Sequence, residues 1–158
     1  TFATVGVLAV SCGDEVNYVN ANFIAKEKGI DLTTSEFSNH SGYQNKVSIN
    51  ITTPTGVKTI SGTVFNEDVQ RIVEINGFPL DIEPKGKMII MRNHDVPGVI
   101  GEVGKILGNN NINIADFRLS RGKDGALAVI LIDEKACSDV LKKLDSLEAA
   151  IAVAYAEI

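Results

Sequence analysis

The residues best suited to chemistry gather in one short segment, which reads Asn93-His94-Asp95-Val96-Pro97-Gly98-Val99-Ile100. Pro97 suits the first turn of a helix, because the amide hydrogen it lacks would be unpaired there. A helix N-terminus offers free amide hydrogens and a partial positive charge, which suit a carboxylate. Gly98 lets a ligand approach the backbone closely, and Asp95 adds a negative charge just outside the helix. The segment therefore predicts a small site for paired anionic and cationic groups.

A second polar residue extends this prediction. Asn113 stands near the start of the next expected strand and offers both a donor and an acceptor. With Asp95 and the amides of Val99 and Ile100, it would match both ends of a free amino acid. The plainer interpretation makes Asp95 an ordinary N-cap, since such caps are common, and Asn113 an exposed strand residue.

Other chemistries find little support in the sequence. It holds neither a dinucleotide fingerprint nor a Walker loop. The histidines His40 and His94 lack metal-ligand spacing, and Cys12 and Cys137 stand far apart. We therefore expect no catalytic residue, metal or cofactor in this chain, and a reduced, cytoplasmic protein. The net charge of -5 argues against nucleic acid, and no apolar run approaches the roughly 20 residues of a membrane span.

The elements that position this segment follow a clear order in the second half of the chain. Strands are expected at residues 87–91, 112–121, 126–132 and 150–156, and helices at residues 97–107 and from Asp133 onward. This order is βαββαβ, the ferredoxin-like arrangement. Its first crossover brings a strand end, a loop and a helix N-terminus close together.

The first half predicts helices followed by an antiparallel sheet. Residues 2–10 fit either a helix or a buried strand. Residues 16–28 predict a helix with Val16, Val19, Phe23 and Ile24 on its buried face, closed by Gly29. Residues 47–51 alternate like a half-buried strand, and Asn76-Gly77 predicts a hairpin. A polar link at residues 83–86 marks the boundary, so we expect an α+β protein with domains at residues 1–83 and 87–158.

Residues 87–158 resemble an ACT domain, a small amino-acid-sensing module. The resemblance rests on the run from Asp95 to Gly101, followed by Gly108 and Ile112-Asn113-Ile114. Residues 16–30 and 61–77 resemble the intervening, allosteric substrate-binding domain of the type 1 D-3-phosphoglycerate dehydrogenase family. That family's domain has an additional strand ahead of the position of Thr1, so we interpret this chain as truncated at its N-terminus.

The resemblance implies a regulatory role. Members of the family oxidise 3-phosphoglycerate with NAD in catalytic domains that this chain lacks, and L-serine inhibits them by binding between paired ACT domains. By position, Asn93, Asp95 and Asn113 match the family's serine ligands, although relatives often have His or Tyr at the position of Asn93. Val96, Gly98, Val99 and Ile100 complete the expected effector site. The resemblance also implies a homodimer through the ACT domains, with a tetramer as a further option for the parent enzyme.

A second site is implied in the intervening domain. There Lys58 and Arg71 are candidate ligands for an anion, and Glu83 is acidic where some relatives are basic. Two other functions remain open: the regulatory region of an iron–sulfur L-serine dehydratase, and a module that only dimerises.

Overall fold

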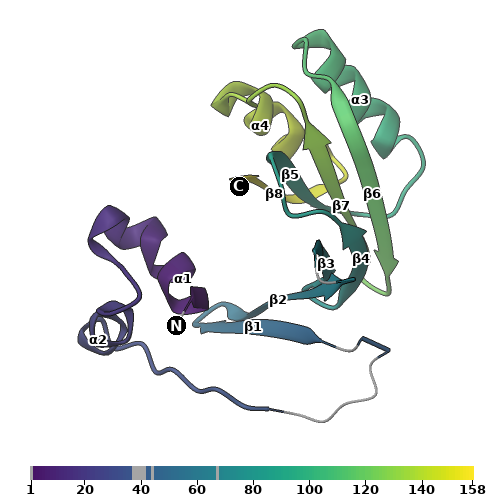
Figure 1. The fold of residues 1–158 in the computed structure, drawn as a ribbon. Helices are drawn as coiled ribbons and strands as arrows, with labels where there is room; N and C mark the ends of the chain where they lie inside the picture. Colours follow the sequence, from purple (N-terminus) through teal and green to yellow (C-terminus); the bar gives the residue numbers. More distant parts are fainter. Residues whose placement is uncertain (1, 37–41, 44, 67) are drawn as a thin grey trace. The chain divides into compact units, whose positions relative to one another are not determined.

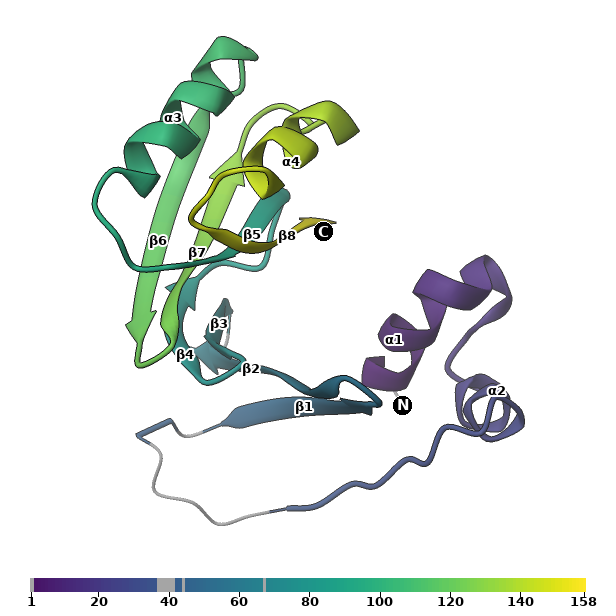
Figure 2. The same ribbon diagram turned by 180° about the vertical axis from the view of Figure 1, so that it is seen from behind.

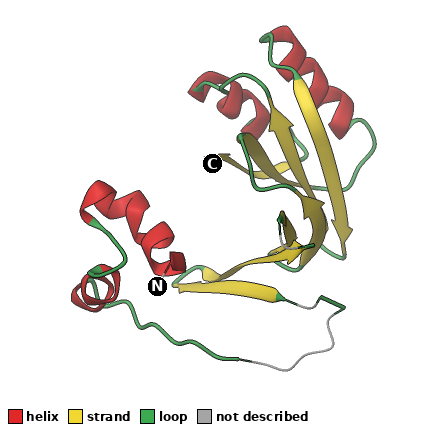
Figure 3. Ribbon diagram, viewed as in Figure 1, coloured by secondary structure: helices red, strands yellow, loops and turns green. Residues whose placement is uncertain are grey.

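The computed structural model describes residues 2–36, 42–43, 45–66 and 68–158 (Figure 1). The chain forms two compact units, Thr1–Gly42 and Tyr43–Ile158. The first holds α1 (Phe2–Cys12), the 3-10 turn η1 (Gly13–Glu15) and α2 (Ala21–Glu27). The second holds β1 (Lys46–Thr53), β2 (Gly56–Phe65), β3 (Val69–Ile75), β4 (Phe78–Ile82), β5 (Lys87–Asn93), α3 (Val99–Asn109), β6 (Ile114–Gly122), β7 (Gly125–Ile132), α4 (Ser138–Asp145) and β8 (Ala150–Glu157). Helices and strands both contribute (Figure 3), which confirms the α+β class.

The first unit is helical, and α2 begins later than predicted. The side-chain oxygen of Asn17 accepts hydrogen bonds from the amides of Val19 and Asn20, at 2.9 and 3.1 Å. This turn delays the helix to Ala21, which changes the face that is buried. Val19 and Phe23 are exposed, contrary to expectation. The small core consists of Leu8, Val16, Ala21 and Ala25.

In the second unit, strands β1 to β4 form an antiparallel meander in chain order. The predicted hairpin is confirmed: Asn76 and Gly77 have φ values of 49° and 80°, as a tight primed turn requires. Strand β1 is confirmed, but its apolar side is less buried than predicted. Ile49 is half-buried, whereas Val47 and Ile51 are exposed, because no described element of this unit covers that side.

Strands β5 to β8 form a second antiparallel sheet in the order β6-β7-β5-β8, which confirms the ferredoxin-like arrangement. Helices α3 and α4 cover one face of it (Figures 1 and 2). Ile89 and Met91 of β5 point into the core beneath these helices, as do Ala128 and Ile130 of β7. Strand β6 forms one edge of the sheet, beside the N-terminal end of α3.

The two sheets of the second unit share an apolar core across the polar link. It contains Ile72, Ile75, Phe78, Ile82, Met88, Leu127 and Val129. Phe78 packs against Gly122 so closely that a Cβ added to this glycine would lie 2.8 Å from the ring. The Arg92 guanidinium lies 4.4 Å from the ring centroid. The predicted domain boundary at residues 83–86 therefore falls inside one compact unit.

Candidate functional site

The loop after β5 gives α3 an open N-terminus. Gly98 has a φ of 94°, a left-handed conformation that favours glycine. It therefore cannot lie within the helix, and α3 begins at Val99, two residues later than predicted. The first helical hydrogen bond runs from the Glu102 amide to the Gly98 carbonyl, at 3.0 Å. The amides of Val99 and Ile100, which precede it, have no partner within the helix.

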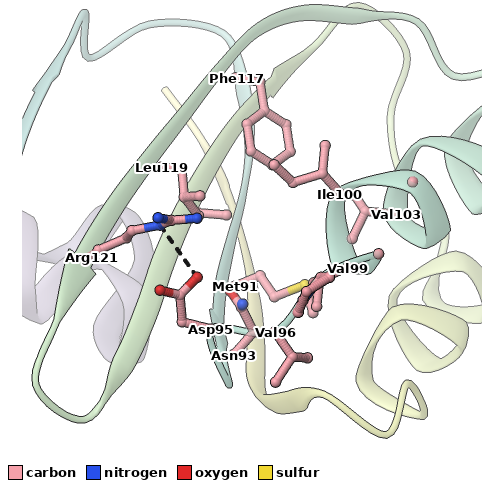
Figure 4. A pocket seen from close by; sticks show the side chains of 14 residues that line it. Met91, Asn93, Asp95, Val96, Val99, Ile100, Val103, Phe117, Leu119 and Arg121 are labelled. Carbon is pink, nitrogen blue, oxygen red and sulfur yellow. Dashed lines mark ion pairs between the residues drawn. The ribbon is translucent and has the colours of Figure 1, made fainter.

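A pocket of about 440 Å³ opens at this N-terminus (Figure 4). Its apolar wall comprises Met91, Val103, Phe117, Leu119 and Ala128. Its polar groups are Asn93, Asp95 and Arg121, together with the backbone of α3. Asn93, Asp95, Val96, Gly98, Val99 and Ile100, which the sequence predicted as site residues, all line it. The structure thus brings most of the predicted set around one cavity.

Asn93 supplies an acceptor that nothing in the described chain satisfies. The residue ends β5 and is 3% exposed. Its side-chain NH₂ donates to the His94 carbonyl at 2.8 Å. Its Oδ1 is buried without a hydrogen-bond partner among the described residues. Leaving such a group unpaired costs about 1–3 kcal/mol, so a donor arriving in the pocket would gain from meeting it.

Asp95 lies opposite a cation that the sequence did not single out. Its Oδ1 is 3.3 Å from Nε of Arg121 on β6 (Figure 4). Arg121 pairs with Ala126 of β7, which pairs in turn with Asn93 of β5. This row of three residues places Arg121 and Asn93 on the same face of the sheet, two strands apart. One local signal in the sequence pointed to Arg121 as a site residue. It is the alternation of β6, which sets Phe117, Leu119 and Arg121 on the same face.

Asn113 is not part of the pocket in a single chain. It precedes β6, at the opposite end of that strand from Arg121. Its amide donates to Glu134 at 2.7 Å, and its side chain donates to Asp133 at 2.6 Å. One copy of the chain therefore cannot use Asn113 and Asp95 on the same small ligand.

The structure separates the two candidates for an anion site. Lys58 is paired with Ile51 on one side of the first sheet, whereas Arg71 is paired with Thr63 on the other. Arg71 also lies 3.1 Å from Asp81 and 3.8 Å from Glu83, measured between its nitrogens and their carboxylate oxygens. In this arrangement two carboxylates face the single positive charge of Arg71.

Glu83 belongs to a charged cluster with Lys85 and Arg71. Lys85 donates a hydrogen bond to its carboxylate, and this bond, with the positive charges of Lys85 and Arg71, lowers the pKa of Glu83. Within the residues described, no three His, Cys, Asp or Glu side chains gather as metal ligands. His40 lies outside the described residues. None of the described helices has the length and apolar character to span a membrane.

Both halves of the chain match known protein families. Residues 1–76 match the D-3-phosphoglycerate dehydrogenase intervening domain, and residues 87–149 match the ACT domain. A D-3-phosphoglycerate dehydrogenase of Bacillus subtilis is 39% identical over 127 residues, covering 80% of this chain and 24% of the relative. One of Archaeoglobus fulgidus is 31% identical and covers 97% of this chain and 30% of the relative. The chain thus spans about a quarter of the length of these curated relatives.

Proposed function

The chain belongs to the D-3-phosphoglycerate dehydrogenase family, through its intervening domain and an ACT domain, and from this premise we propose that it is a regulatory region that binds L-serine. The parent enzyme would oxidise 3-phosphoglycerate with NAD in catalytic domains elsewhere, and serine would inhibit it as the end product. The names of the relatives favour this function over a serine dehydratase.

The observation that carries the proposal is the unpaired Oδ1 of Asn93 in a pocket shared with Asp95 and the start of α3. The serine ammonium would donate to Asp95, and also to this oxygen once the buried Asn93 side chain turns it toward the pocket. The serine carboxylate would accept from the amides of Val99 and Ile100, where the helix dipole favours negative charge. An acceptor pair and a donor pair that line one pocket match the two ends of an α-amino acid.

A second copy of the chain would complete the site. Strand β6 is an edge strand, and edges invite pairing with another chain. A two-fold axis near Phe117 would pair two β6 strands antiparallel. Asn113 of the second copy would then lie near Arg121 and the Asp95 loop of the first. Two equivalent sites would form, each with contributions from both copies.

Replacing Asp95 tests the ammonium contact. Asp95→Ala should weaken L-serine binding by about 1.5–3 kcal/mol, the usual contribution of a hydrogen bond to a charged group. Isothermal titration calorimetry measures this loss. Asp145→Ala is the matched control, because Asp145 is exposed at the end of α4, away from β6, and does not line the pocket. Equal serine affinity for Asp95→Ala and the unaltered chain would refute the assignment.

A further inference from the structure

We infer that Arg121 determines specificity in this pocket, by binding the ligand's carboxylate while it pairs with Asp95, so that the site accepts zwitterionic amino acids and rejects amines. The inference rests on the proposed function and deepens it. Sequence reasoning assigned the carboxylate to the helix amides alone. The structure adds the long cationic side chain of Arg121, which enters the same pocket from β6 (Figure 4).

The ion pair leaves both side chains with hydrogen-bonding groups that a ligand can use. Arg121 approaches one Asp95 oxygen through Nε, and a carboxylate has a second oxygen that can accept from an ammonium. The contact with Asp95 runs through Nε, and the two terminal guanidinium nitrogens of Arg121 donate no hydrogen bond to the residues that the structure describes. Their fork of N–H groups matches a carboxylate, which they can bind in bidentate fashion. Asp95 and Arg121 can therefore stay paired while each binds one end of a zwitterion.

The same arrangement works against a ligand that carries only a positive charge. An amine at Asp95 would lie beside the Arg121 guanidinium with no carboxylate to compensate it. Like charges at such range repel, and specificity often comes from this kind of penalty on the wrong ligand. Ethanolamine is serine without its carboxylate, so comparing the two ligands isolates the contribution of the carboxylate to binding. It keeps the ammonium and the hydroxyl that the other pocket groups would meet.

An opposite role is conceivable on chemistry alone, in which Arg121 blocks Asp95 until a ligand displaces it. The geometry argues against such a block. The pair is a single contact of 3.3 Å between side chains that are 72% and 37% exposed. Exposed pairs of this kind contribute little to stability, so Arg121 is not held firmly enough to compete with a ligand. The two roles predict changes of opposite sign when Arg121 is neutralised.

The test compares Arg121→Gln with Lys142→Gln, titrated with L-serine by calorimetry and with ethanolamine by NMR. Lys142 is exposed on α4, away from β6, and does not line the pocket, and its variant has the same net charge as Arg121→Gln. Arg121→Gln should weaken serine binding roughly tenfold, with ethanolamine binding unchanged or tighter. Lys142→Gln should match the unaltered chain with both ligands. Equal thermal unfolding midpoints for the two variants would exclude a folding effect.

The inference fails if Arg121→Gln binds serine as well as or better than the unaltered chain does. It also fails if the variant's affinities for serine and for ethanolamine fall by the same factor. If the unaltered chain binds another amino acid in place of serine, the serine assignment fails. The Arg121 comparison then proceeds with that amino acid and the amine that lacks its carboxylate. If the unaltered chain binds no amino acid, both proposals fall.

Discussion

Phe78→Ala is expected to lower the free energy of unfolding of this chain by about 3–5 kcal/mol, the usual cost of deleting a buried phenylalanine ring. The Phe78 side chain is 8% exposed, and it fills the space left by Gly122 at the join of the two sheets. The Arg92 guanidinium covers its face. Removing the ring would leave a cavity that the backbone at Gly122 cannot close. Urea unfolding followed by circular dichroism measures the change.

Phe65→Ala is the matched control for this loss. Phe65 ends β2 in the same sheet, but its side chain is 41% exposed, so its removal should cost far less than that of Phe78. Because the two sheets share one core, they should also unfold in a single transition in the unaltered chain. Similar losses for both variants, or a Phe78→Ala protein as stable as the unaltered chain, would contradict this account.

The parts of the fold that the sequence predicted well are those governed by local rules. The Asn76-Gly77 hairpin follows from two residues that tolerate positive φ. The βαββαβ order follows from hydrophobic periodicity in segments of strand and helix length. Most of the candidate site was also predictable, because Asn93, Asp95 and the start of α3 lie within one loop of the chain.

Local rules failed where a nearby residue overrode the periodicity. The apolar stripe through Val19 and Phe23 suggested a buried helical face. The side-chain hydrogen bonds of Asn17 instead fix a turn, so α2 begins at Ala21 and buries small residues. Likewise Pro97 suggested the first residue of α3, but the left-handed backbone of Gly98 moves the start to Val99.

Arg121 could not be predicted from a loop motif, because its place in the site depends on strand pairing. It meets Asp95 through the register of β6 on β7 and of β7 on β5. A β-bulge between Ile114 and Asp116 also shifts the early part of β6, so counting alternate residues forward from Asn113 is unreliable. Sequence spacing gives neither the register nor the bulge, and together these decide which β6 side chains face the pocket.

L-serine should strengthen the proposed dimer of this chain if the ligand touches both copies. Two-fold pairing along β6 would bring Asn113 of one copy to the pocket end of the other, since Asn113 precedes the strand and Arg121 lies near its end. A single chain instead holds Asn113 on Asp133 and Glu134, away from the pocket. A ligand that binds only the dimer stabilises it by about 2.7 kcal/mol per site at one hundred times its dissociation constant. The dimer dissociation constant should then fall about 100-fold for each site filled.

Sedimentation velocity over a dilution series, with and without L-serine at that concentration, measures the shift in the dimer midpoint. Asp95→Ala supplies the control, because it keeps the β6 edge but loses the ammonium contact, so added serine should move its midpoint much less. In the parent enzyme such bracing of the regulatory pair would couple serine to a distant catalytic cleft, provided that the cleft closes by relative domain motion. A midpoint that stays fixed while calorimetry detects serine binding would show that the ligand lies within one copy, and inhibition would then need a route other than dimer strength.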